Sequence, residues 1–105
     1  MKHVLTLASV LTLLLMQTTG AAAAGDAAKG KKIYMVNCIA CHNLDPSKDG
    51  AIGPANKGSS RELVEARVLR GKYPKGYKPK RTTKLMPPLP HLKPHIDDLT
   101  AFLNQ

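Results

Sequence analysis

Apolar and polar residues follow helical patterns in three parts of this chain, and two long irregular stretches separate them. Residues 59–70 and 94–105 repeat apolar side chains at helical spacing, and residues 25–38 combine good helix formers with an apolar end. Residues 43–57 are rich in turn formers, and the prolines within 85–90 exclude a helix there. Because we find no internal repeat and no convincing strand, the pattern predicts an all-α protein.

The predicted helix over residues 59–70 has a start signal and a stop signal. Ser59 followed by Glu62 three positions later forms a capping box, and Gly71 is a suitable C-terminal stop. The apolar side of this helix comprises Leu63, Val64, Val68 and Leu69. The side chains expected to face away from it are Glu65, Arg67 and Arg70.

The first 24 residues have the three-part layout of a secretory signal peptide. Lys2 gives a basic start, residues 4–16 are mostly apolar, and Ala22 and Ala24 fit a small-residue cleavage site. The apolar run is shorter than the roughly 20 residues that a membrane-spanning helix needs. We therefore expect cleavage near Ala24, which leaves one small domain over residues 25–105.

The charge of the chain is strongly positive. It has 16 Lys and Arg residues against 7 Asp and Glu residues, and removal of Lys2 with the signal leaves a formal charge of +8. This balance favours an acidic partner or a transient association with an anionic membrane surface, and export argues against nucleic acid. Six of these cations lie in residues 72–84, a segment without any acid: Lys72, Lys75, Lys78, Lys80, Arg81 and Lys84. That basic loop is interpreted as a docking surface, with a merely solvated loop as the alternative.

The strongest chemical signal is the C-x-x-C-H run formed by Cys38, Cys41 and His42. This spacing is the attachment pattern of a c-type haem, in which two thiols add across the porphyrin vinyl groups and the histidine becomes the proximal iron ligand. The alternatives are a redox dithiol and part of a zinc site. A redox dithiol would be expected in a βαβ unit, and a zinc site would usually need a second cysteine pair, but the sequence shows neither. We therefore predict one haem held through Cys38 and Cys41.

With these residues in view, the chain resembles the class I cytochrome c family of small monohaem electron carriers. The resemblance rests on the C-x-x-C-H run and on Leu85-Met86-Pro87. It implies three to four helices wrapped around the haem, with an N-terminal helix crossing the C-terminal one. Gly30 and Tyr34 match the crossing positions of the first helix, and Leu99 and Phe102 match those of the last.

The resemblance also implies a partner for the proximal histidine. Gly53-Pro54 matches a family glycine-proline pair whose proline carbonyl accepts a hydrogen bond from that ring. Tyr73 or Tyr77, in the basic loop, is a candidate donor to a haem propionate.

Met86 is the best candidate for the second iron ligand. Met1 and Met16 leave with the signal, and Met35 is expected to lie in the core. A thioether favours ferrous iron, and a six-coordinate iron suits outer-sphere electron transfer. The alternatives are a five-coordinate iron and ligation by His91 or His95.

These observations predict a monomeric periplasmic electron carrier rather than an enzyme. It would shuttle single electrons through a haem c whose iron is held by His42 and Met86. Its partners would be an oxidase, reductase or dehydrogenase with an acidic docking surface. The alternatives are a haem subunit held permanently in a larger oxidoreductase, and a five-coordinate haem sensor or peroxidase-like protein.

Overall fold

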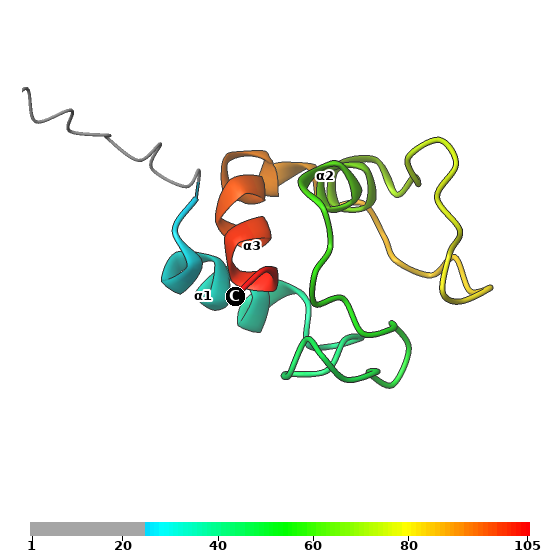
Figure 1. Cartoon of the computed structure of the whole chain (residues 1–105), viewed down its shortest axis with the longest axis horizontal. Helices are drawn as coiled ribbons and strands as arrows, with labels where there is room; N and C mark the ends of the chain where they lie inside the picture. The colour runs from blue at the N-terminus through cyan, green and yellow to red at the C-terminus, as the bar shows by residue number, and fades with distance from the viewer. Residues whose placement is uncertain (1–24) are drawn as a thin grey trace, which may run out of the picture.

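The computed structural model describes residues 25–105, so the predicted signal segment 1–24 lies outside the described residues. Helices and loops make up this part of the chain, which contains no strand, and the predicted all-α class is confirmed. The elements in chain order are α1 (Ala27–Asn37), α2 (Arg61–Arg70), the 3₁₀ helix η1 (Pro90–His95) and α3 (Ile96–Leu103). Figure 1 shows α2 set apart from the α1 and α3 pair, with long loops extending from it.

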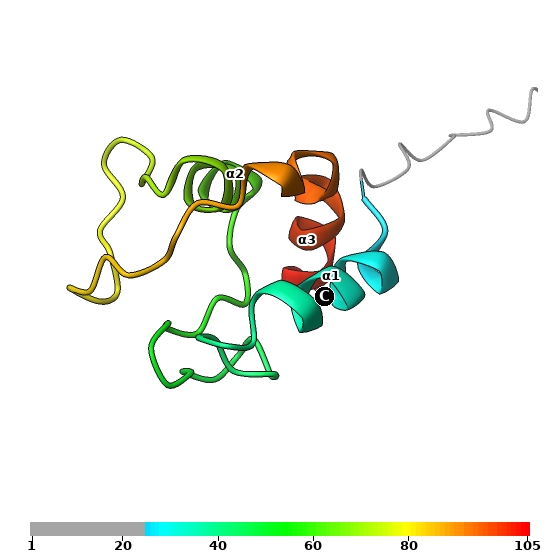
Figure 2. The same cartoon turned by 180° about the vertical axis from the view of Figure 1, so that it is seen from behind.

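The first and last helices cross in direct contact, as both Figure 1 and Figure 2 show. A Cβ atom at Gly30 would overlap the backbone carbonyl of Asp98, so only glycine permits this approach. One turn further along, the rings of Tyr34 and Phe102 pack with their centroids 5.2 Å apart. The predicted crossing is confirmed. The close packing of α1 on α3 offsets the loss of about 1 kcal/mol in helix stability that a glycine causes relative to alanine.

The start of α2 differs from the prediction by one residue. Ser60, not Ser59, is the N-cap, and its side chain accepts a hydrogen bond from the Leu63 backbone N–H. The Ser59 hydroxyl instead donates to the Asn56 carbonyl, so this hydrogen bond lies within the loop that precedes α2. The predicted stop is correct, because Gly71 adopts a left-handed conformation with φ of 63°.

The last α-helix begins later than predicted. Residues 90–95 form the 3₁₀ helix η1, and α3 starts only at Ile96. Pro94 lies inside this 3₁₀ helix, where its missing N–H and its ring would not be tolerated in the interior of an α-helix that included residues 90–95. The proline therefore precedes the α-helix instead of beginning it.

One apolar core joins α1, α2, η1 and α3. Its buried members are Tyr34, Val64, Val68, Leu92, Ile96, Leu99 and Leu103. Met35 is not among them, since it is 43% exposed on the outer side of α1, and its predicted place in the core is wrong. Within residues 25–105, no helix has the length and apolar character needed to cross a membrane.

Candidate functional site

A cavity that is partly open to solvent lies between the helices and the two long loops. Val64 and Val68 of α2 and Leu99 and Leu103 of α3 line it, and all four also belong to the buried core. The protein therefore has a mostly apolar chamber at its centre.

Most of the residues predicted from the sequence meet at this cavity. Those that line it are Cys38, His42, Pro54, Tyr73, Tyr77 and Met86. The two remaining residues, Cys41 and Gly53, lie next to His42 rather than on the cavity wall, and the Gly53 N–H donates to the Cys41 carbonyl at 2.9 Å. Residues from widely separated parts of the chain thus converge on one chamber.

The imidazole of His42 is held by contacts on two sides. Its Nδ1 lies 3.0 Å from the Pro54 carbonyl oxygen, which can only accept a hydrogen bond. This contact assigns the proton to Nδ1 and leaves the lone pair on Nε2 for a metal ion. Gly53 is buried against the ring, and a side chain there would overlap it. The ring is therefore oriented before any ligand binds.

The two cysteines do not have the character of a redox dithiol. Both are free thiols in the structure. Burial, with a smaller contribution from Cys41, raises the pKa of the Cys38 thiol to about 11. Catalytic dithiols instead have a lowered pKa, which supplies the reactive thiolate. In residues 25–105, no three His, Cys, Asp or Glu side chains gather into a possible metal site.

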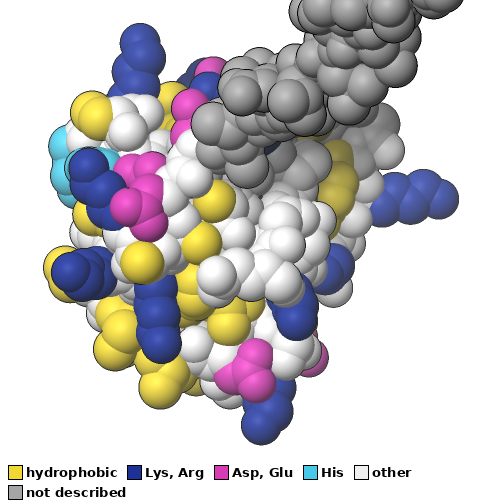
Figure 3. Space-filling model, turned by 60° about the vertical axis from the view of Figure 1, so that its left-hand side comes forward, with side chains coloured by type: hydrophobic (Ala, Val, Ile, Leu, Met, Phe, Trp, Pro, Cys, Tyr) yellow, Lys and Arg dark blue, Asp and Glu magenta, His cyan; other side chains and the backbone are white. Residues whose placement is uncertain are grey.

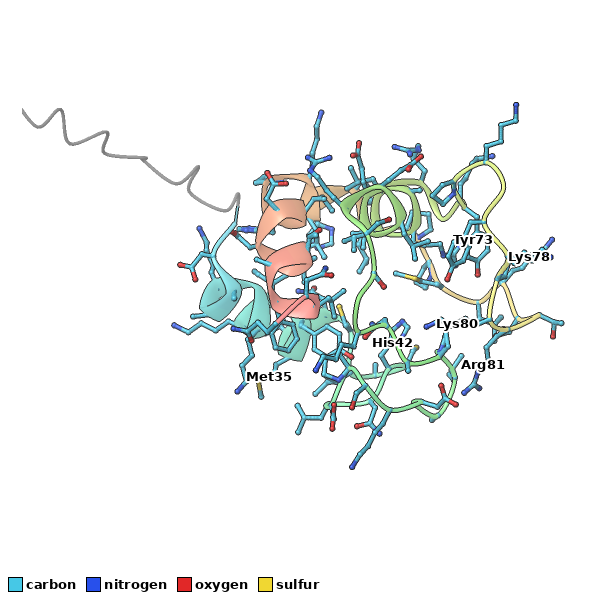
Figure 4. The ribbon with its side chains drawn as sticks, in the orientation of Figure 1. Met35, His42, Tyr73, Lys78, Lys80 and Arg81 are labelled. Atoms are coloured by element: carbon cyan, nitrogen blue, oxygen red, sulfur yellow. The ribbon has the colours of Figure 1, made fainter. Side chains whose placement is uncertain are left out.

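The candidate second ligand is placed on the same cavity. Met86 is half-buried and packs against the apolar core. Neither of its histidine competitors lines the cavity: His91 is exposed, and His95 Nδ1 lies 3.5 Å from Asp98 Oδ2. Met35 points away from the chamber in Figure 4, on the outer side of α1. Met86 is therefore the methionine of the described chain that shares a wall with His42.

Two cations, Arg67 and Lys80, also line the cavity. Lys80 belongs to the basic loop interpreted above as a docking surface, whereas Arg67 was not predicted as a functional residue. The expectation that Arg67 faces away from the apolar side of its helix is wrong. It follows Leu63 by four residues and Val64 by three, and both of those side chains also line the cavity. Helical spacing alone thus places Arg67 on the apolar side, although its charge suggests the opposite.

Asn56 adds an unsatisfied polar atom to the same wall. Its side-chain Oδ1 is buried and has no hydrogen-bond partner among the described residues. Buried polar atoms in native proteins usually have a partner, including ordered water or a ligand. The orphan atom, the apolar walls, the thiols and the imidazole together fit a large, mostly apolar cofactor with polar edges, which describes a haem.

Fold and site together define a small all-α protein of the covalent-haem class. The chain belongs to the cytochrome c family, because the family model described as "Cytochrome c" matches residues 27–105. A cytochrome c-553-like protein of Synechocystis sp. is 28% identical over 80 residues, which cover 76% of this chain and 66% of that relative's length. No solved structure matches the chain. Membership of this family means that the protein carries covalent haem c.

Proposed function

We propose that this chain is an exported single-electron carrier whose haem iron is held between His42 and Met86. The observation that carries the proposal is that both side chains line one cavity, together with the thiol of Cys38. An imidazole and a thioether are the axial ligand pair of electron-carrying c-type cytochromes. The bound haem would supply a reversible one-electron change between ferric and ferrous iron.

Each residue of the proximal side has a separate task in this proposal. Cys38 and Cys41 hold the cofactor through thioether bonds, so it stays bound in both oxidation states. The Pro54 carbonyl oxygen accepts a hydrogen bond from Nδ1–H of His42, with the two heavy atoms 3.0 Å apart, which fixes the ring and increases the electron donation of Nε2. Because this geometry exists in the protein itself, the proximal side would need little rearrangement when the bound haem changes oxidation state.

The distal side depends on a loop that is tied to α2. The Leu89 N–H donates to the Val68 carbonyl at 2.6 Å, three residues after Met86. Pro87 and Pro88 restrict the backbone between these two points. A loop fixed in this way can hold a thioether in place, so Met86 would serve as a ligand to the iron and would leave no position open for a substrate.

A matched pair of methionine variants tests the ligand assignment. Met86→Ala should open the distal site, allow carbon monoxide to bind, and lower the reduction potential, because a thioether favours ferrous iron. Met35→Ala removes the same group from an exposed position on α1 and should leave both properties unchanged. An unchanged spectrum and potential in Met86→Ala would show that Met86 is not the ligand.

The proposed docking surface is the basic loop, residues 72–84. Lys72, Lys75, Lys78 and Lys84 are exposed, and no acid interrupts the segment. The face formed by α1 and α3 is different, because Figure 3 shows acidic and apolar side chains between its cations. The concentration of unbalanced positive charge in one loop supports docking to an acidic redox partner, since opposite patches accelerate encounter.

Salt dependence tests this docking. If the loop attracts an acidic partner, the bimolecular electron-transfer rate should fall as ionic strength rises, because salt screens exposed charges. Lys78→Gln should lower the rate at low salt more than Lys31→Gln, which removes an equal charge from exposed α1. Equal rates for the two variants at every ionic strength would refute docking through the loop.

Export is the remaining part of the proposal. We infer that residues 1–24 are removed as a signal and that the domain of residues 25–105 works in the periplasm. The helical domain begins immediately afterwards, with Asp26 as the N-cap of α1. Mass spectrometry of the periplasmic protein should find a chain that begins near Gly25. A cytoplasmic chain that retains residues 1–24 would contradict this part.

A second candidate function is that of a haem subunit within a larger oxidoreductase. The observation that favours it is a set of exposed large apolar side chains: Met35, Val36, Ile39, Leu44, Ile52 and Leu85. Large exposed apolar surfaces often mark protein contacts. Size-exclusion chromatography of a native extract distinguishes the two candidates. A free carrier elutes at its monomer size, whereas a subunit elutes with its complex.

A further inference from the structure

One peptide unit beside the proximal histidine forms two hydrogen bonds, one on each side. The Pro54 carbonyl oxygen lies 3.0 Å from His42 Nδ1. The N–H of the same unit belongs to Ala55, and it donates to Asp49 Oδ1 at 2.8 Å. No peptide bond of residues 25–105 is cis, so the carbonyl and the N–H of this planar unit point in opposite directions. The imidazole, the peptide and the carboxylate therefore form one continuous chain of hydrogen bonds.

A tight turn fixes the two ends of this chain of hydrogen bonds relative to each other. The Gly50 N–H donates to the Gly53 carbonyl at 2.9 Å, which closes the turn between the carboxylate and the peptide. The Gly53 N–H donates to the Cys41 carbonyl at 2.9 Å. A Cβ atom at Gly50 would overlap that same carbonyl, so the turn packs directly on the C-x-x-C-H run. The backbone itself thus places the Asp49 carboxylate within reach of the Ala55 N–H.

The carboxylate of Asp49 is charged and has a second partner. Its Oδ2 lies 3.5 Å from Nη2 of Arg81, a residue of the basic loop that Figure 4 shows near the segment after His42. The hydrogen bond from the Ala55 N–H lowers the pKa of Asp49 most, and Arg81 lowers it further. Because the Asp49 side chain is 67% exposed, solvent and salt screen its long-range field, and the hydrogen bond is its direct contact with the site.

We propose that Asp49 is a positioning residue for the proximal ligand: through the Pro54–Ala55 peptide it strengthens the electron donation of His42 and lowers the reduction potential of the haem. This inference rests on the proposed function, in which His42 ligates the iron. Hydrogen bonds in a chain polarise one another, so a carboxylate at the N–H makes the carbonyl oxygen a stronger acceptor. A stronger acceptor at Nδ1 raises the basicity of Nε2, and a more basic ligand favours ferric iron.

A purely structural role for Asp49 is distinguishable, because asparagine separates the charge of the side chain from its shape. Asp49→Asn keeps an oxygen that can accept a hydrogen bond from the Ala55 N–H, so the turn retains this contact. The substitution removes the negative charge, and hydrogen bonds to an ionised acceptor are roughly twice as strong as those between neutral groups. A residue that only holds the turn would therefore tolerate asparagine, whereas a residue that polarises the peptide would not.

The reduction potential of the haem-loaded protein provides the first test. Asp49→Asn is compared with wild type and with Asp45→Asn at low and at high ionic strength. Asp45 is the matched control, because it is an exposed carboxylate of the same loop whose hydrogen bonds come from Ser47. Salt screens the loss of an exposed charge, so the shift in Asp45→Asn should disappear at high ionic strength. The potential of Asp49→Asn should stay above that of wild type under both conditions.

The His42 Nδ1–H resonance in proton NMR of the reduced, haem-loaded protein provides the second test. A weaker hydrogen bond should move this resonance upfield in Asp49→Asn and leave it in place in Asp45→Asn. An unmoved resonance in Asp49→Asn, or a potential equal to that of wild type at high ionic strength, would overturn the proposal. The absorption spectrum of the same samples reports axial ligation separately. A low-spin His/Met spectrum with an unmoved resonance therefore refutes the role of Asp49 alone, and a spectrum without histidine ligation refutes the proposed ligation itself.

Discussion

Gly53→Ala is expected to disturb the proximal histidine specifically. Gly53 is buried, and its φ lies outside the left-handed region, so its backbone accepts alanine. The obstacle is the ring of His42: a Cβ at this position would lie 2.5 Å from Nδ1 and 2.8 Å from Nε2. Non-bonded heavy atoms prefer separations of about 3.5–4.0 Å, so the ring or the loop must move by about 1 Å.

The cost of this movement has two parts. Overpacking a tight site costs about 1–3 kcal/mol. If the ring moves away from Pro54, loss of their hydrogen bond adds about 0.5–1.5 kcal/mol. We therefore expect Gly53→Ala to reduce the free energy of unfolding by about 1.5–4.5 kcal/mol, which is the sum of these two effects. The reduction potential should also change, because the hydrogen bond supports the electron donation of His42.

Denaturant unfolding, the absorption spectrum and the potential of the haem-loaded protein measure these effects together. Gly58→Ala is the control, since Gly58 has a φ of +81° and a Cβ added there would have no atom within 4 Å. It should cost about 1–2 kcal/mol in backbone strain and leave the spectrum and potential unchanged. Wild-type stability, spectrum and potential in Gly53→Ala would refute the reasoning.

Three further predictions concern the contacts that support the site. Gly30→Ala should destabilise the protein in denaturant unfolding despite its better helix propensity, because the new Cβ overlaps the Asp98 carbonyl; a more stable variant would contradict this. A hydrogen bond from the Asp26 N–H holds the pKa of Asp98 below its usual value, so Asp98→Asn should lower the melting temperature at pH 7. That difference should shrink as the pH falls through the lowered pKa, and a constant difference down to about pH 2 would count against it. Tyr34→Phe removes the hydrogen bond to the Asn43 carbonyl and should cost about 1 kcal/mol on unfolding; an unchanged value would show that the bond contributes nothing.

Features that depend on local patterns are predictable from the sequence. Glycine inside the first predicted helix, at Gly30, indicates a close crossing, and the structure brings that residue against α3. The stop at Gly71 is predictable because left-handed helix ends favour glycine. The fold class and the haem cofactor follow from the helical patterns and the C-x-x-C-H run, and the family match confirms both.

Features that depend on distant contacts are harder to predict. The charge of Arg67 favours the solvent side, but Tyr73, beyond the end of its helix, provides a ring face that holds it at the cavity. The apolar character of Met35 favours the core, although the crossing of α1 on α3 turns it outwards. Helical spacing places Arg67 on the apolar side of α2, but the contact that holds its charge there depends on which neighbour the fold supplies. The exposure of Met35 depends on such a neighbour as well.

The measurement that tests the central proposal most directly is the absorption spectrum of the exported, haem-loaded protein, oxidised and reduced, with and without carbon monoxide. Ligation by His42 and Met86 predicts a low-spin spectrum, a weak long-wavelength thioether-to-ferric-iron band, and no response to carbon monoxide. A high-spin spectrum with prompt binding of carbon monoxide would contradict it, and would favour a five-coordinate sensor or a peroxidase-like protein.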